Sequence, residues 1–303
     1  MYLTSLPDHT DPLFDEVAYF KKFSQQNIIV NAVNTESFCD DHVGCLSIKT
    51  VMEGEEFYDV DQRKLILRPG QFLVLNNEQR YGCRIDPGTK VKCLSIFFQR
   101  DFAASVLHDA QHNEYNLLDD RGVGSTVPEF FQTLNEVTPA LQQHFSTLIN
   151  ELEQFGYDEN RVNESMVFLL RQLISSHRSE LTRTQQVTAV KAGTRHEIYR
   201  RLCMAKDLLH SSYNEQLDLM TISSQAFLSV PQLVRQFKSA FDCTPHQYLI
   251  RIRLDHAARL LQQTDIPVQD ITWKCGFENL SAFSRAFKSA YGLQPTAYRK
   301  QRA

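Results

Sequence analysis

The sequence predicts an α+β fold in which a β barrel with flanking helices precedes an all-α domain of seven helices. Short apolar or alternating runs with turn residues between them fill residues 25–100, and helical periodicity dominates from residue 138 onward. The last third of the chain also repeats itself, which indicates two similar structural units. In that repeat, Arg235, Phe237, Lys238, Ser239, Ala240, Phe241, Pro245 and Tyr248 are answered by Arg285, Phe287, Lys288, Ser289, Ala290, Tyr291, Pro295 and Tyr298.

The expected strands of the barrel are short and regularly spaced, as in an antiparallel barrel or sandwich. Turns are expected at Pro69-Gly70 and Pro87-Gly88, where proline presets φ and glycine accepts a positive φ. The pattern leaves open which parity of the last strand faces inward, Val91, Cys93, Ser95 and Phe97 or the residues between them. The apolar or alternating runs that form the strands lie at residues 27–33, 43–51, 55–60, 64–76, 81–85 and 91–98, and the run 64–76 contains the Pro69-Gly70 turn.

Helices follow the barrel. A short helix is expected at 101–110, and two longer amphipathic helices are expected within 138–178. The longer pair either covers the barrel or binds a second subunit in a homodimer, and the sequence leaves both open. A polar stretch without periodicity then suggests a linker. The resulting domains are a barrel at 1–125, a helical coupling or dimerisation region at 126–180, a linker at 181–195 and a helical domain at 196–303.

The final domain contains two helix-turn-helix units. In each copy of the repeat a shorter helix, at 219–227 or 268–277, precedes the helix that carries the repeated residues. N-caps are expected where a short polar side chain precedes a helical pattern. These caps are Asp218, Ser229, Thr244 and Asn279.

The charge is distributed unevenly along the chain. Residues 1–194 contain 17 Lys/Arg against 27 Asp/Glu, whereas residues 195–303 contain 15 against 9. A basic helical domain suits the phosphates of double-stranded DNA, and an acidic front half suits a small ligand or a protein partner.

The second helix of each unit is expected to bury Leu233 and Phe237, or Phe283 and Phe287, and to expose polar groups on its other side. Arginine can pair with guanine and glutamine with adenine, whereas lysine more often meets phosphate. For Arg235 and Arg285 the alternative is an ion pair with an acidic residue such as Asp218 or Asp270. The predicted DNA-binding residues are Gln232, Arg235, Gln236, Lys238, Asn279, Ser281, Ser284, Arg285 and Lys288.

Residues 196–303 resemble the DNA-binding domain of the AraC/XylS transcription regulators, most visibly in DITWKCGFENLSAFSRAFKSAYGLQPTAYRK at 270–300. The resemblance implies two helix-turn-helix units joined by a linker helix at 245–263, so that one chain enters two successive major grooves. It also implies a transcription activator, with promoter DNA and RNA polymerase as partners. Phe227 departs from the family pattern, because it replaces the glycine of the first turn, and we expect that turn to differ in shape.

By the same resemblance, the front half is a cupin-like barrel that binds a small-molecule effector, with RPGQFLVL at 68–75 as its most recognisable segment. The alternative is a front half that only dimerises or binds a protein partner. The side chains proposed to hold an effector are Tyr58, Arg63, Tyr81, Arg84, Cys93 and Phe97.

Other functions are disfavoured. A metal-dependent cupin enzyme would need clustered histidines with a carboxylate, but His42, His108, His112 and His144 are scattered, so we expect no catalysis, metal or cofactor. The seven cysteines form no CxxC pair and suggest free thiols in a reducing cytoplasm. No apolar run has the roughly 18 residues of a membrane span, and the N-terminus lacks the features of a signal peptide.

Overall fold

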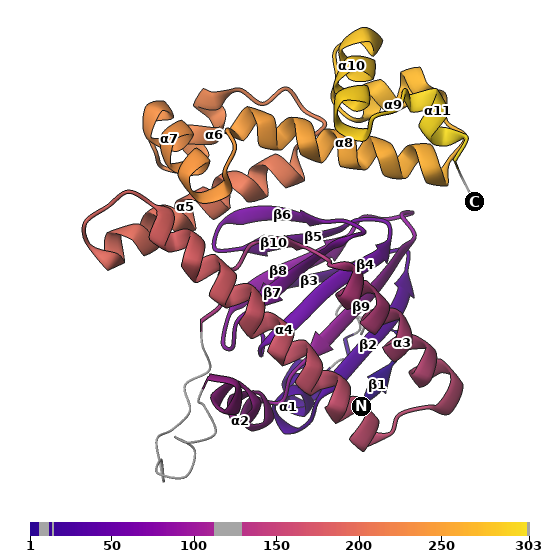
Figure 1. Ribbon diagram of the computed structural model, residues 1–303. Coiled ribbons are helices and arrows are strands. Elements are labelled where there is room, and N and C mark those ends of the chain that lie inside the picture. Colours follow the sequence, from indigo (N-terminus) through magenta and orange to yellow (C-terminus); the bar gives the residue numbers. More distant parts are fainter. Residues whose placement is uncertain (6–11, 14, 112–128, 302–303) are drawn as a thin grey trace. The chain divides into compact units, whose positions relative to one another are not determined.

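The computed structural model describes residues 1–5, 12–13, 15–111 and 129–301 (Figure 1). The chain divides into two compact units, Met1–Thr182 and Arg183–Ala303, and the predicted α+β fold is confirmed. The expected domain end at residue 125 lies outside the described residues, as does His112. Among the residues that are described, no helix has both the length and the apolar character needed to cross a membrane.

The first unit is built on two sheets that form a flattened barrel. Every strand pair is antiparallel except β1 with β2. The larger sheet has the order β1 (Tyr2–Leu3), β2 (Ile28–Asn34), β9 (Val91–Phe97), β4 (Ser47–Glu53), β7 (Gln71–Leu75) and β10 (Leu134–Glu136). The smaller sheet has the order β3 (Ser37–Val43), β8 (Arg80–Ile85), β5 (Glu56–Val60) and β6 (Arg63–Leu67).

The alternation of side chains gives the larger sheet two buried faces. Val51, Val91 and Cys93 pack against residues of the smaller sheet, such as Val60 and Leu65. The parity of β9 that the sequence left open is thereby settled, because Val91, Cys93 and Phe97 face the space between the sheets. The residues between them, Leu94 and Ile96, face the other way.

Helices cover that other face. Helices α3 (Pro139–Phe155) and α4 (Glu159–Gln186) lie over the larger sheet (Figure 1). Their residues Phe145 and Met166 share a core with Ile48, Leu94 and Ile96. The apolar stripe of these helices therefore covers the barrel, which is one of the two roles that the sequence allowed. The described part of this unit also contains the helices α1 (Glu16–Gln25) and α2 (Arg100–Gln111).

The expected linker at 181–195 is mostly helical, which corrects the sequence prediction. Helix α4 continues to Gln186, and α5 (Ala192–Ser211) begins soon after, so that only residues 187–191 separate them. Polarity misled the prediction here, because an exposed helix can be polar on most of its surface.

The second unit contains the seven helices that the sequence predicts, all within its described residues. After α5 come α6 (Leu219–Gln225), α7 (Val230–Phe241), α8 (Pro245–Gln263), α9 (Val268–Lys274), α10 (Leu280–Tyr291) and α11 (Pro295–Arg299). The four expected N-caps are confirmed. Each of Asp218, Ser229, Thr244 and Asn279 accepts a hydrogen bond from a backbone N–H of the helix that follows it.

Candidate nucleic-acid interface

Two helix-turn-helix units are present, one formed by α6 and α7 and the other by α9 and α10. In the second helix of each unit the predicted core residues are fully buried: Leu233 and Phe237 in α7, and Phe283 and Phe287 in α10. Burial of this stripe fixes the rotation of each helix about its axis, so that the opposite side faces solvent.

Helix α8 joins the two units. Its first turns contribute Tyr248, which packs edge-on against Phe237 of the first unit, and its last turns contribute Leu261, which lies in one core with Phe287 of the second. The 19 residues of α8 span roughly 28 Å, which is comparable to the spacing of about 34 Å between successive major grooves. One continuous core element therefore sets the separation of the two second helices.

Most of the predicted DNA-binding residues lie on the solvent side of α7 and α10. Arg235, Lys238, Arg285 and Lys288 are exposed, and within the described chain no ion pair engages either arginine. The structure therefore gives no support to the alternative that these arginines brace an acidic residue. Asn279 and Ser281 are also exposed, and Gln232 and Ser284 are partly buried.

The structure corrects the predicted DNA-binding role of Gln236. Its side chain is 1% exposed, and its amide group bonds the backbone of Thr188 twice: Oε1 accepts from the Thr188 N–H at 2.9 Å, and Nε2 donates to the Thr188 carbonyl at 3.1 Å. A base contact would require both bonds to break, so Gln236 is a packing residue that holds the segment after α4. The sequence could not reveal this, because Thr188 lies 48 residues away.

The sequence predicts a differently shaped turn in the first helix-turn-helix unit, and this prediction is wrong. The N–H groups of Phe227 and Leu228 donate to the carbonyl groups of Ser224 and Ser223, which is the pattern that Gly276 and Phe277 make with Trp273 and Thr272 in the second helix-turn-helix unit. Gly276 provides a φ of 76° in the second turn, where an added Cβ would lie 2.9 Å from the Tyr213 carbonyl oxygen. In the first turn Phe227 itself adopts a φ of 52°, and the residue is 69% exposed. A non-glycine residue in this region is strained, so other contacts must hold the turn.

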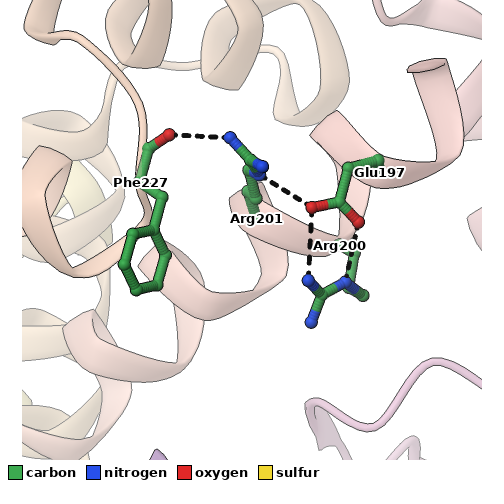
Figure 2. Close-up of polar contacts among 4 residues, drawn as sticks. All are labelled: Glu197, Arg200, Arg201 and Phe227. Carbon is green, nitrogen blue, oxygen red and sulfur yellow. Dashed lines mark hydrogen bonds and ion pairs between the residues drawn. The ribbon is translucent and has the colours of Figure 1, made fainter.

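Figure 2 shows those contacts. Arg201 of α5 donates a hydrogen bond from Nη1 to the Phe227 carbonyl oxygen at 2.9 Å and another from Nε to Glu197 Oε1 at 2.8 Å. Arg200 also binds Glu197, through Nε to Oε2 at 3.0 Å. Hydrogen bonds from Arg200 and Arg201 lower the pKa of Glu197 to about 2, so the carboxylate stays ionised and orients the Arg201 guanidinium.

The candidate effector residues of the first unit are only partly brought together. Tyr58, Tyr81, Cys93 and Phe97 lie buried in the core between the two sheets. Arg84 does not belong with them, since its neighbours Tyr81 and Ile85 share that core and it lies on the other side of β8. There it pairs with Asp86 at 3.1 Å and covers the Phe57 ring.

Arg63 binds the backbone of a neighbouring segment, because its Nη1 donates a hydrogen bond to the Gln132 carbonyl oxygen at 2.9 Å. Neither arginine therefore supports an anion site in the barrel. The sequence marked both as cations near strands, but cross-strand pairing and loop contacts decide what such residues touch.

The structure adds three residues that sequence reasoning missed. Ser47, Lys49 and Glu56 are 0%, 4% and 3% exposed. Ser47 and Lys49 share the face of β4 that carries Val51, and the Lys49 ammonium lies 3.6 Å from the centroid of the Phe97 ring. Burial lowers the pKa of Lys49 and raises the pKa of Glu56 to about 6. The only sequence signal for Ser47 and Lys49 was the strand alternation of SIKTV at 47–51, and for Glu56 that of EFYDV at 56–60, and alternation fits either parity.

Two thiols of the barrel, those of Cys45 and Cys93, are held in their protonated form. Burial raises the pKa of Cys45 to about 11 and that of Cys93 to about 12. Within the described residues no group of three or more metal-binding side chains has the arrangement of a metal site. A thiol needs thiolate character to react with oxidants or metals, so these cysteines behave as small packing residues.

Two helix-turn-helix units on one connecting helix, with cationic and hydroxyl groups exposed on both second helices, define a DNA-binding domain. Residues 222–301 match the family described as a helix-turn-helix domain. The C-terminal domain is of the AraC/XylS type, the DNA-binding domain of a family of transcription regulators.

The similar proteins are bacterial transcription regulators. The probable transcriptional regulator LumQ of Photobacterium leiognathi is 30% identical over 50% of this chain and 66% of its own length. The transcriptional activator RhaS of Enterobacter sp. (strain 638) is 29% identical over 58% of this chain and 66% of its own length. The chain thus spans slightly less than two thirds of these relatives. They are regulators and not enzymes, as the sequence predicts for this chain.

Among solved structures, the DNA-binding domain of AdpA in complex with a target DNA is similar. It is 31% identical over 33% of this chain and 90% of that domain, with a TM-score of 0.32.

Proposed function

We propose that this protein is a sequence-specific transcription activator that places α7 and α10 in successive major grooves of a promoter. One observation carries the proposal. Arg235 and Arg285 occupy equivalent positions in the two repeated units, and each is exposed on a helix that buries a pair of large apolar residues, Leu233 and Phe237 or Phe283 and Phe287. An arginine presented in this way can bond both acceptors of a guanine, while Lys238 and Lys288 are placed to meet phosphates.

Activation implies further partners. We propose that the protein recruits RNA polymerase at the promoter and acts in the cytoplasm, where bacterial DNA lies. The family relation to an activator such as RhaS supports this sign of regulation. A second copy of the chain would have to use surface outside the apolar stripe of α3 and α4, because that stripe packs on the barrel.

We further propose that a small molecule in the N-terminal barrel controls DNA binding. Lys49 and Glu56 support this proposal, because buried charged side chains destabilise a domain unless they are paired. Control would operate by population shift: an effector that binds one arrangement of the protein more tightly favours that arrangement by the difference in binding free energy.

A binding-site selection with the full-length protein tests DNA recognition. Arg285→Ala should weaken binding to the selected site by about 1–3 kcal/mol and relax the preference at one base pair. Arg171→Ala, which removes an exposed arginine from α4 in the first unit, is the matched control and should leave the selected sequence unchanged. Unchanged selectivity in Arg285→Ala would remove this residue from the base contacts and with it the proposed role of α10.

A further inference from the structure

The space between the two sheets of the first unit contains buried polar groups that the protein leaves unsatisfied. Within the part of the chain that the structure describes, Ser47 Oγ and Glu56 Oε2 have no hydrogen-bond partner, although the Glu56 carboxyl group hydrogen-bonds with Tyr58. Among the described residues no hydrogen bond or ion pair of Lys49 is found, and its ammonium contacts the faces of two rings, 3.6 Å from the Phe97 centroid and 5.6 Å from that of Tyr81. Each such group costs free energy of folding, and the charged groups cost the most.

These groups face one region. Lys49 and Ser47 are two residues apart on the same face of β4, and Glu56 belongs to β5 of the opposite sheet. Glu56 shares its face of β5 with Tyr58 and Val60, which lie in the same core between the sheets as Val51, the neighbour of Lys49 on its face of β4. Tyr58 and Tyr81, whose rings lie 6.2 Å apart, and Phe97 supply aromatic walls.

The chemistry of these buried groups defines which chemical groups a ligand must carry to satisfy them. The Lys49 ammonium offers three donors and a positive charge, which a carboxylate satisfies, and Glu56 Oε2 is an acceptor that a cationic amine satisfies. The two protein charges cancel, so a ligand of zero net charge with opposite charges at its two ends adds no unpaired charge to the buried space. A carboxylic acid alone would leave Glu56 unpaired, and a neutral polyol would neutralise neither charge.

We propose that this inter-sheet site binds a small zwitterion, an amino-carboxylic acid, with its carboxylate at Lys49 and its ammonium group at Glu56. The inference rests on the effector control proposed above and specifies the class of effector. Ser47 lies beside Lys49 on β4 and offers a further hydrogen bond to the carboxylate.

The stability of the ligand-free protein is the first test, because it separates a binding role from a structural one. If Lys49 is kept for a ligand, Lys49→Met removes an unpaired buried charge and should raise the thermal unfolding midpoint of the ligand-free, full-length protein by roughly 2–4 °C. If Lys49 instead stabilises the fold through Glu56, the midpoint should fall, and that result would overturn the proposal.

Binding is the second test. The probes are the twenty protein amino acids, β-alanine and 4-aminobutyrate at millimolar concentration, with matched carboxylates, matched amines and glycerol as controls, measured by thermal shift and native mass spectrometry. At least one zwitterion should bind, and its deaminated and decarboxylated analogues should not. Lys49→Met and the isosteric Glu56→Gln should each weaken its binding by about tenfold or more.

Three results would contradict the inference: binding of no zwitterion, equal binding of a carboxylate or of glycerol, or unchanged affinity in both variants. DNA binding measured on the same samples separates this failure from failure of the proposed function. A protein that binds its selected DNA but no zwitterion loses only the effector class proposed here. A zwitterion that binds without changing DNA affinity leaves the site in place and removes effector control.

Discussion

Arg201 Nη1 donates a hydrogen bond to the carbonyl oxygen of Phe227 at 2.9 Å, and thereby ties α5 to the turn of the first helix-turn-helix unit. Phe227 has a φ of 52°, a conformation that glycine adopts without strain. Glu197 fixes the guanidinium from the other side, so a three-residue polar chain supports a backbone conformation that the second unit obtains from Gly276.

Replacement of Phe227 should depend on the shape of the new side chain. Phe227→Gly relieves left-handed strain but adds entropy to the unfolded chain, so the free energy of unfolding should change by less than about 1 kcal/mol. Phe227→Val should lose about 1–2 kcal/mol, because a β-branched residue fits this conformation poorly. The unfolding free energies of both variants can be measured by urea unfolding followed by the fluorescence of Trp273. This residue is the only tryptophan and lies in the same compact unit as Phe227, Arg183–Ala303. Equal stability of the two variants would refute the strain at this turn.

Gln236→Ala should affect stability and not base preference. The truncation leaves the N–H and carbonyl group of Thr188 without their partners, which should cost about 1–3 kcal/mol of unfolding free energy. Gln232→Ala, on the same helix but only partly buried, is the control and should cost less than about 0.5 kcal/mol. A changed base preference in a binding-site selection with Gln236→Ala would restore Gln236 as a DNA contact.

Lys288→Ala tests the expected phosphate contact. Loss of one phosphate contact should reduce affinity for all DNA sequences and lower the slope of log affinity against log salt by about one. Titrations of the full-length protein with specific and non-specific duplexes over a range of salt concentrations give that slope. Lys64→Ala removes the same charge from an exposed site on β6 and should leave the slope unchanged. A slope equal to that of the wild type would exclude Lys288 from the phosphate contacts.

Glu56 should make stability depend on pH. Burial raises its pKa from 4.5 to about 6, so the folded protein holds this proton more tightly than the unfolded chain does. The contribution is fully present below pH 4.5 and is lost as the pH rises through 6, a loss of about 2 kcal/mol by pH 7. In the Glu56→Gln variant the unfolding free energy should not fall in this way as the pH rises, because glutamine does not titrate. The groups that interact electrostatically with Glu56 are Lys49, Tyr58, Tyr81, Cys83 and Cys93.

Urea unfolding between about pH 4.5 and 7.5, followed by far-ultraviolet circular dichroism, compares the wild type with Glu56→Gln. The difference in unfolding free energy between the two proteins should grow in favour of the variant as the pH rises. A difference that stays constant across this range would show that Glu56 does not titrate with a raised pKa.

Much of the compact unit Arg183–Ala303 could be predicted from the sequence, because the sequence signals of its caps and helices are local. A cap and the N–H that it binds are three residues apart, as in Asp218 and Thr221, and the linker helix 245–263 was predicted with the bounds that the structure shows. Strand β3 was missed because SFCDDHV is too polar to read as a strand, and its pairing with β8 supplies what the local pattern lacks.

By itself, the sequence determined the order of barrel and helical domain, the duplicated helix-turn-helix units and their DNA-binding class, because each follows from residues a few positions apart. Only the tertiary structure decided that Gln236 is buried against Thr188 and that Lys49 and Glu56 face one buried space. The physical reason is that burial and charge pairing depend on residues from distant parts of the chain, whereas caps, turns and periodicity depend on near neighbours.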